Sequence, residues 1–187
     1  MTTILSEKTK KKRAPVEYLC ILDFEATCDD KGPKPCPQEI IEFPTLLMNV
    51  SNGKIEDTFH HYIKPDVHPT LSDFCKKITG ITQETVDSGI SLERALELHE
   101  KWLNKHRLMN NGLISSEVTT AKRFLYVICG DWDLKRCLPD QLQHHGITMP
   151  PAFGNWINLH KAYVKFYRTK VKTIAEMLDN LNLDLEE

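Results

Sequence analysis

Two carboxylates lie two residues apart at the end of an apolar segment. Asp23 and Glu25 follow the apolar run from Tyr18 to Leu22. Side chains alternate along a strand, so residues two apart point to the same side of a sheet. Two ionised carboxylates beside a core repel each other unless a cation lies between them, and hard oxygen ligands suit Mg²⁺ or Mn²⁺. The pair predicts a divalent cation site, although a solvent-exposed strand end would give the same pattern.

A second acidic segment, Cys-Gly-Asp-Trp-Asp, occupies residues 129–133. It lies where an apolar strand pattern gives way to a helical one, the place where open α/β sheets bind their ligands. Asp131 is predicted to cap the helix, and Asp133 to supply a third carboxylate from its first turn. Three carboxylates from two strand ends can hold two ions roughly 3.5 to 4 Å apart, the arrangement that cleaves phosphodiesters. The segment therefore favours nuclease chemistry.

The apolar patterns predict the strands that position these residues. Strands are expected over residues 18–24, 39–50, 54–63 and 124–129, with a loop over 29–37 and a tight turn at Ser51-Asn52-Gly53. Three strands in succession indicate an antiparallel meander, and the fourth feeds a helix. This order predicts an α/β fold with a mixed sheet of the ribonuclease H-like kind, flanked by helices.

Apolar residues at helical spacing predict the helices. One helix opens at Ser91, with His99 at the edge of the core, and one follows residue 133. A third is expected over residues 156–167, with an apolar side predicted to face the core rather than to stack on bases. Thr173 with Glu176 resembles a capping box that opens a fourth. The predicted buried faces are Leu92, Ala95, Leu96, His99, Trp102 and Leu103; Leu134, Cys137, Leu138 and Leu142; and Trp156, Leu159, His160, Tyr163, Phe166 and Tyr167.

Composition bounds the class of protein. The chain has 187 residues, 41% of them apolar, and 24 basic against 26 acidic residues for a net charge of −2. This suits one domain, expected over residues 16–187 after a disordered basic leader at 1–15. No apolar run approaches the roughly 20 residues of a membrane span, and no secretion signal is evident. We expect an intracellular protein, cytoplasmic or nuclear or both, away from membranes, with six reduced cysteines.

Basic residues gather in two runs, within residues 8–13 and within 161–172. Each is consistent with a solvated surface and equally with an RNA contact or a nuclear-import signal.

Five strings, in this order and spacing, resemble one family. They are Asp-Phe-Glu-Ala-Thr-Cys (23–28), Gln-Glu-Ile-Ile-Glu-Phe-Pro (38–44), Phe-Cys-Lys-Lys-Ile-Thr-Gly-Ile (74–81), Gly-Asp-Trp-Asp (130–133) and Trp-Ile-Asn-Leu (156–159). Over about residues 16–186 the chain is similar to the Eri-type (enhanced RNA interference) DEDDh exonucleases. It looks most like their short single-domain members of the prion-protein-interacting type.

The resemblance implies 3′-to-5′ exoribonuclease activity with two Mg²⁺ ions, or Mn²⁺, on RNA with a single-stranded 3′ end. Asp23 would bridge both ions, Glu25 would bind one and help to orient the attacking water, and Asp133 would hold the other. The residues implied to line the substrate cleft are Ala26, Thr27, Thr79, Gly80 and Ile81, with the small Ala26 beside the terminal nucleotide. From the residues alone, the stretch 79–81 is equally a turn between helices.

The family pattern continues with a Gly-Arg-x-His-x-Gly-x-Asp-Asp-like segment, whose His is the general base and whose final Asp binds metal. The run Thr173 to Glu187 matches the helix before that segment, and the 187 residues do not include it or the last helix of the family. General-base catalysis is worth about 10² to 10⁴ in rate, so we expect impaired activity for the chain as written. None of its eight histidines occupies the base position.

Three functions remain open at this level. The first is the metal-dependent exoribonuclease, and the second is a catalytically inactive RNA-binding or protein-interaction form of the same fold. The third is a DNA-specific proofreading exonuclease, which shares the metal chemistry and differs in how the sugar is read. The motif strings resemble the RNA branch more closely.

Overall fold

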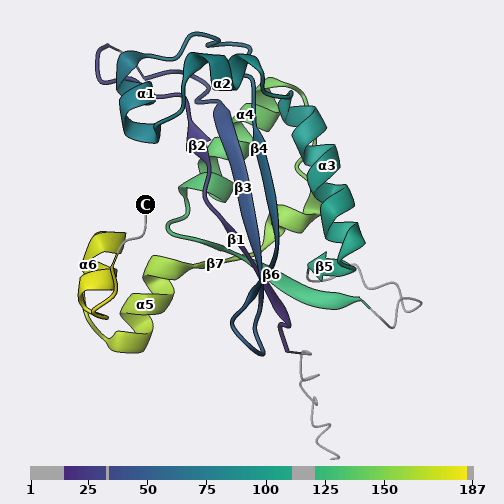
Figure 1. The fold of residues 1–187 in the computed structure, drawn as a ribbon, viewed down its shortest axis with the longest axis vertical. Coiled ribbons are helices and arrows are strands. Elements are labelled where there is room, and N and C mark those ends of the chain that lie inside the picture. The colour runs from purple at the N-terminus through teal and green to yellow at the C-terminus, as the bar shows by residue number, and fades with distance from the viewer. Residues whose placement is uncertain (1–14, 33, 111–120, 185–187) are drawn as a thin grey trace, which may run out of the picture.

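The structure is a computed structural model that describes residues 15–32, 34–110 and 121–184. A mixed sheet runs through its centre (Figure 1). Its strands are β1 (Tyr18–Leu22), β2 (Glu25–Ala26), β3 (Ile40–Asn49), β4 (Ile55–Tyr62), β5 (Leu108–Asn110), β6 (Lys122–Ile128) and β7 (Trp156–Asn158). Strand β3 is antiparallel to β1, β2 and β4, whereas β6 is parallel to β1, β5 and β7. The predicted meander and parallel strand are confirmed. The leader predicted at 1–15 lies outside the described residues up to residue 14.

The helices alternate with the later strands. They are α1 (Asp73–Thr79), α2 (Gln83–Asp87), α3 (Leu92–Lys105), the π-helix η1 (Asp133–Cys137), α4 (Leu138–His144), the 3₁₀ turn η2 (Pro151–Gly154), α5 (Leu159–Tyr167) and α6 (Ile174–Asp179). Two predicted caps are confirmed, because Ser91 accepts the Arg94 N–H at 3.2 Å and Thr173 accepts the Glu176 N–H at 3.1 Å. No helix among the described residues is long and apolar enough to cross a membrane.

The main core lies on the side of the sheet that α3 and α4 cover. All six predicted core positions of α3 are buried, as are the four predicted for the helical stretch after residue 133. His99, predicted at the core edge, is instead 1% exposed and stacks on Phe43 at 4.8 Å between ring centroids. Burial lowers the pKa of His99 to about 3, so the ring is a neutral part of the core.

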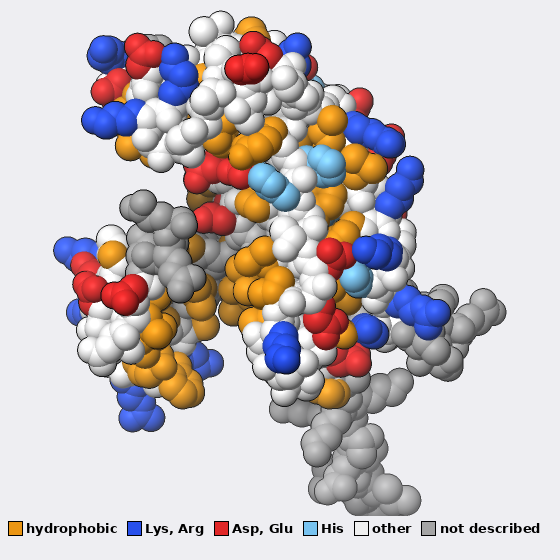
Figure 2. Space-filling view, in the orientation of Figure 1, with side chains coloured by type: hydrophobic (Ala, Val, Ile, Leu, Met, Phe, Trp, Pro, Cys, Tyr) orange, Lys and Arg blue, Asp and Glu red, His pale blue; other side chains and the backbone are white. Residues whose placement is uncertain are grey.

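Two smaller clusters lie on the opposite side of the sheet. Ile41 points away from Ile40, as neighbours in a strand do, and packs with residues of α1 and α2. Tyr163 of α5 packs with Val171 and Met177. Figure 2 shows a hollow between the α1–α2 lobe and the α5–α6 lobe, whose positions are labelled in Figure 1, with acidic side chains at its border. This arrangement leaves the ends of β1 and β2 open to a cleft.

The single helical face predicted for residues 156–167 is wrong in two respects. Residues Trp156–Asn158 form a strand, because they pair with β6 and complete the sheet, and the helix begins only after Asn158. On that helix Leu159 is 42%, Phe166 78% and Tyr167 48% exposed. The helix projects beyond the sheet (Figure 1), and Tyr163, its buried residue, packs with Val171 and Met177, so most of its apolar face finds no core to enter.

Candidate active site

The ends of β1 and β6 bring two of the predicted carboxylates together. The two strands are parallel, so their carboxyl ends lie at the same edge of the sheet. Asp23 follows β1, and Asp133 is the first residue of η1, just after β6. The Phe24 N–H donates to Asp133 Oδ1 at 3.0 Å, which fastens the start of η1 to the end of β1. Phe24 and Asp133, 109 positions apart in the sequence, are therefore in contact, and Asp23 and Asp133 lie at one corner of the cleft.

A further carboxylate, Glu42, was not singled out from the sequence. It lies on β3 directly opposite Glu25 of β2, next to a register shift in the β2–β3 pairing. Like charges directly opposite each other on neighbouring strands are destabilising, so this pair favours a nearby cation or proton. His60 of β4 contacts Glu42, with 2.6 Å between Nε2 and Oε1. An acidic residue inside the apolar stretch Ile-Ile-Glu-Phe was the signal in the sequence.

Burial raises the pKa values of Asp23, Glu25 and Asp133, and neighbouring carboxylate charges add to the shifts of Asp23 and Glu25. Crowding by protein atoms, then the charges of Asp133 and Glu42, raise the pKa of Asp23 to about 6. Desolvation and the charges of Asp23, Glu42 and Asp133 raise the pKa of Glu25. Asp133 is 5% exposed, and burial raises its pKa although the Phe24 N–H opposes the shift. Such a cluster binds a proton or a metal ion readily, because either relieves the repulsion.

Replacing Glu42 with Gln is expected to lower the pKa of Asp23 from about 6 toward its ordinary value. The substitution removes one negative charge and so favours the ionised form of Asp23. Carbon-detected NMR titration of the Asp23 carboxyl in metal-free protein measures the change, with Glu100→Gln on the exposed face of α3 as the control. An unchanged Asp23 titration in Glu42→Gln would show that the two carboxylates are not coupled.

Ala26 and Thr27 directly follow Glu25 of the acidic cluster in the sequence, and both are buried. Ala26 is 7% exposed, and its carbonyl oxygen accepts a hydrogen bond from the Cys75 thiol of α1 at 3.7 Å. The Thr27 hydroxyl accepts the Glu39 N–H at 2.9 Å. The hydroxyl thus connects the chain after β2 to the start of β3, and the role of Thr27 toward a substrate stays a prediction.

The turn at residues 79–81 closes α1 over the same side of the sheet. Gly80 caps α1 in a left-handed conformation at φ 71°, and Thr79 Oγ1 accepts the Ile81 N–H at 3.1 Å. Ile81 packs with Ile41, the residue before Glu42. The structure therefore places this turn on the cleft side, with Gly80 exposed at its tip.

Asp131 does not cap a helix, so that prediction is wrong. Helix η1 begins at Asp133 without a side-chain cap, while the Asp131 carboxylate accepts the Trp156 indole N–H at 3.0 Å and pairs with Lys161. The Lys161 ammonium holds the pKa of Asp131 well below its usual range. Asp131 thus ties α5 to the segment that carries Asp133.

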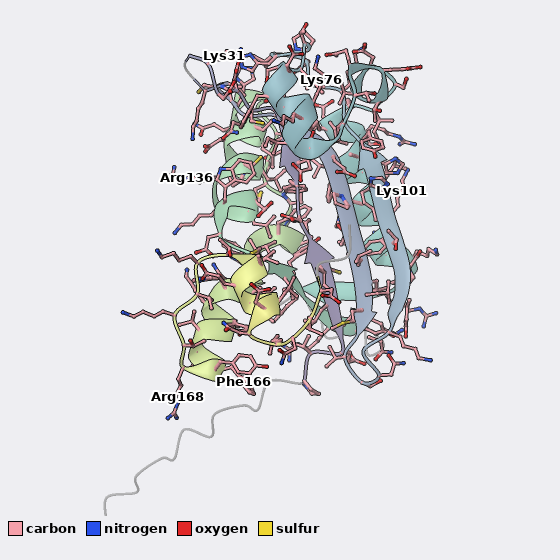
Figure 3. The ribbon with its side chains drawn as sticks, turned by 60° about the vertical axis from the view of Figure 1, so that its left-hand side comes forward. Lys31, Lys76, Lys101, Arg136, Phe166 and Arg168 are labelled. Atoms are coloured by element: carbon pink, nitrogen blue, oxygen red, sulfur yellow. The ribbon has the colours of Figure 1, made fainter. Side chains whose placement is uncertain are left out.

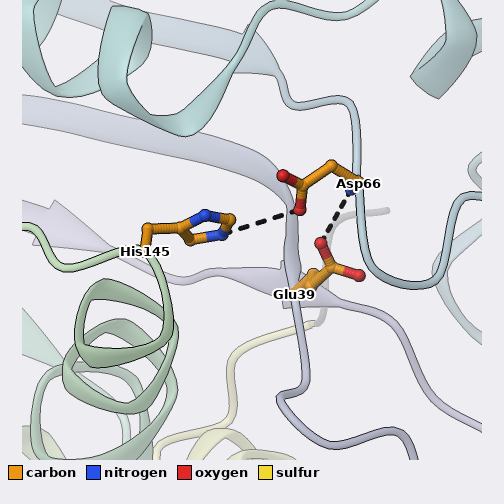
Figure 4. A group of neighbouring side chains, drawn as sticks. All are labelled: Glu39, Asp66 and His145. Carbon is orange, nitrogen blue, oxygen red and sulfur yellow. Dashed lines mark hydrogen bonds and ion pairs between the residues drawn. The ribbon is translucent and has the colours of Figure 1, made fainter.

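Among the described residues, the group whose ligating atoms all lie within 4.8 Å of one another is Glu39, Asp66 and His145 (Figure 4), and it includes none of the predicted trio. Glu39 is fully buried and accepts the backbone N–H groups of Asp66, Val67 and His68 at 2.6 to 3.0 Å. A carboxylate with three such donors is already satisfied. This cluster anchors a loop and gives no reason to place an ion there.

Comparison with known proteins gives concordant results. The Exonuclease family model (RNase_T) matches residues 20–185. The human protein named ERI1 exoribonuclease 3 is 47% identical over 146 residues, which cover 78% of this chain and 40% of that protein. The nuclease domain of 3′hExo, a DEDDh family member solved bound to rAMP, aligns with a TM-score of 0.81 at 34% identity over 92% of this chain and 82% of that one.

A second solved structure describes 3′-end recognition of the histone mRNA stem-loop by a 3′-exonuclease. It aligns with a TM-score of 0.82 at 34% identity, over 93% of this chain and 74% of that one. The chain thus matches nearly the whole of a nuclease domain and spans less than half of ERI1 exoribonuclease 3.

Proposed function

This chain belongs to the Exonuclease family RNase_T, and from that premise we propose that it is a metal-dependent 3′-to-5′ exoribonuclease domain. Its substrate would be RNA with a single-stranded 3′ end, whose unstacked terminal bases can enter the cleft between the two lobes. The similarity to ERI1 exoribonuclease 3 and to the rAMP-bound nuclease domain of 3′hExo supports RNA over DNA.

The meeting of Asp23 and Asp133 where the parallel strands β1 and β6 end, fastened by the Phe24 N–H on Asp133, carries this proposal. Asp23, Glu25 and Asp133 come from two strand ends and face one cleft, with Glu42 beside them. A set of carboxylate oxygens that repel one another fits hard divalent cations such as Mg²⁺ or Mn²⁺. The donor set present in the chain therefore fits the cofactor that the function needs, and we propose two Mg²⁺ ions.

Each residue has a distinct role in this proposal. Asp23 would bridge both ions, Glu25 would bind one and orient the attacking water, and Asp133, held by the Phe24 N–H, would bind the other. Bound divalent ions supply activation of water and stabilisation of the leaving oxygen. Ala26, which is 7% exposed and packs with the main core, would lie against the terminal nucleotide, where a small side chain leaves room for the sugar.

The turn from Thr79 to Ile81 would form the opposite wall of the cleft. The exposed Gly80 tip presents backbone rather than a side chain, so a nucleotide can approach it closely. Packing of Ile81 against Ile41 fixes the distance between this wall and the carboxylates. Thr27 and Thr79 would act here by holding the backbone of the cleft in place, because each hydroxyl forms a hydrogen bond with a backbone group.

A denaturing gel of 5′-labelled, unstructured RNA incubated with the purified chain tests the proposal. With Mg²⁺ we expect a ladder of products shortened from the 3′ end, weak for the 187 residues and strong for an extended version. We expect no products with EDTA and slower shortening of DNA of the same sequence. The assay includes the chain extended by a Gly-Arg-x-His-x-Gly-x-Asp-Asp segment, because the resemblance assigns the general base to that segment.

Two results would overturn the proposal. Internal cleavage products would indicate an endonuclease. RNA binding without any shortening, in both the 187-residue chain and its extended version, would favour a non-catalytic RNA-binding module.

A further inference from the structure

The end of α5 and the loop after it form an exposed basic and aromatic surface. Five of the 24 basic residues of the chain lie within residues 161–172, where no acidic residue occurs. Among the described residues, only Lys161 of these five forms an ion pair. The other four, all exposed, are Lys165, Arg168, Lys170 and Lys172. The net charge of the whole chain is −2, so this positive surface is local.

Two aromatic rings lie among these cations. Phe166 is 78% and Tyr167 48% exposed, with 4.8 Å between their ring centroids. Phe166 and Arg168 extend from the α5 end of the molecule in Figure 3. In Figure 2 the hydrophobic side chains of this lobe are bordered by basic ones. Core packing does not explain an aromatic ring exposed to this degree.

The backbone at Arg168 is unusual. Arg168 ends α5 in the left-handed conformation, at φ 54° and ψ 34°. Glycine is the common residue at this position of a helix, because a side chain there costs conformational energy. The chain therefore carries an arginine at a position where glycine would fold more easily.

This surface is tied to the catalytic corner. Lys161, on the first turn of α5, pairs with Asp131, and Asp131 also accepts the Trp156 N–H. Asp131 is two residues from Asp133, so α5 has a fixed position relative to the carboxylates. The α5–α6 lobe borders the hollow that Figure 2 shows, so an RNA strand with its 3′ end there would pass along this lobe.

We propose that the end of α5 and the loop after it bind the upstream part of a single-stranded RNA substrate. Arg168, Lys165 and Lys170 would contact phosphates, and Phe166 would stack on a base. Charge complementarity with a polyanion and the exposed rings point to this partner, since cations that track the backbone and rings that stack on bases are how single strands bind without sequence preference. The inference rests on the proposed function and adds to it a preference for longer RNA.

Fluorescence anisotropy in EDTA, where cleavage stops, tests the proposal with 5′-labelled RNAs of about 20 and about 4 nucleotides. Phe166→Ala is expected to weaken binding of the long RNA about 5- to 100-fold and leave the short RNA unchanged. Arg168→Gly should reduce the slope of log Kd against log salt by about 0.7, the effect of one lost phosphate contact. Its melting temperature should stay equal or rise, because glycine suits the left-handed conformation.

Lys101→Ala, on the exposed face of α3 and labelled in Figure 3, is the matched control and should leave the affinity for both RNAs unchanged. The proposal is overturned if both variants bind the long RNA like the parent, or if the short RNA loses as much affinity as the long one. Binding to anionic phospholipid vesicles that the variants lose, with RNA binding unchanged, would instead assign the surface to membranes. If neither the chain nor its extended version shortens RNA with Mg²⁺, but the chain still binds the long RNA more tightly than the short one, only the proposed function is contradicted.

Discussion

Asp23→Asn should reduce metal-dependent RNA shortening at least about a hundredfold. Loss of an outer partner of a metal ligand already costs about 10- to 100-fold in affinity or activity, and Asp23 would be a direct ligand of both ions. Asparagine keeps the size and one oxygen of the side chain but removes the charge that attracts a cation. The Phe24–Asp133 contact does not involve the Asp23 side chain, so the corner of the cleft should stay assembled.

The same substitution should stabilise the metal-free protein at neutral pH. The pKa of Asp23 is raised from 3.8 to about 6, so the folded protein holds this proton more tightly than the unfolded chain does. Ionisation of Asp23 therefore costs stability as the pH rises from about 4 through about 6, and the cost is complete above that range. Asparagine resembles the protonated form and avoids the cost.

Because the Asp23 side chain is exposed, the gain is reduced by solvent to about 1 kcal/mol, or a rise in melting temperature of about 2 to 4 °C for a chain of this size. The gain should appear at pH 7 in EDTA and vanish at about pH 3, below the pKa of both states. Thermal unfolding of parent and variant at the two pH values, beside the gel assay, measures both effects. Glu100→Gln is the control for loss of a remote carboxylate. A variant that keeps full activity, or melts lower than the parent at pH 7, would refute this account of Asp23.

Phe43→Ala should lower the free energy of unfolding by about 3 to 5 kcal/mol. Phe43 is 0% exposed, and its ring contacts those of Phe24, Phe59 and His99 at centroid distances of 4.8 to 5.1 Å. Removal of the ring loses its burial and leaves a cavity that rigid aromatic neighbours cannot fill. Since a domain of this kind is stable by only about 5 to 15 kcal/mol, the loss is a large fraction of the total.

The effect should also reach the active site. Phe43 directly follows Glu42, and it packs on Phe24, whose N–H holds Asp133. Urea unfolding at pH 7 measures the stability loss, and Phe166→Ala provides a matched control at a ring that is 78% exposed, with an expected cost below about 0.5 kcal/mol. A loss below about 1 kcal/mol for Phe43→Ala would mean that the ring is not central to the core.

The strands β1, β3, β4 and β6 could be predicted from the sequence because their signals are local. The run from Tyr18 to Leu22 is apolar on both faces, as a central strand requires, and Asn52-Gly53 marks the hairpin between β3 and β4. The buried face of α3 follows from helical periodicity, and its start follows from Ser91. In these cases the residue type and spacing alone decide the conformation.

The candidate site could be predicted from the sequence for a similar reason. The spacing of Asp23 and Glu25 predicted one side of one strand; in the structure Asp23 follows β1 and Glu25 begins β2. Asp133 follows the buried strand β6, which is parallel to β1, so the two strands end at the same edge of the sheet. The rule that parallel strands end together therefore predicted their proximity.

By itself, then, the sequence determined the strands β1, β3, β4 and β6, the core faces of α3 and α4 and three candidate acidic ligands. Only the tertiary structure decided which partners the remaining side chains meet. Glu42 became part of the acidic cluster through its register against Glu25, and Asp131 turned from a cap into the partner of Trp156 and Lys161. The apolar face of α5 stayed exposed, because that helix extends past the sheet it was expected to cover. Periodicity shows which side of an element is apolar, whereas strand register and helix placement fix what that side touches, and these depend on contacts between residues far apart in the chain.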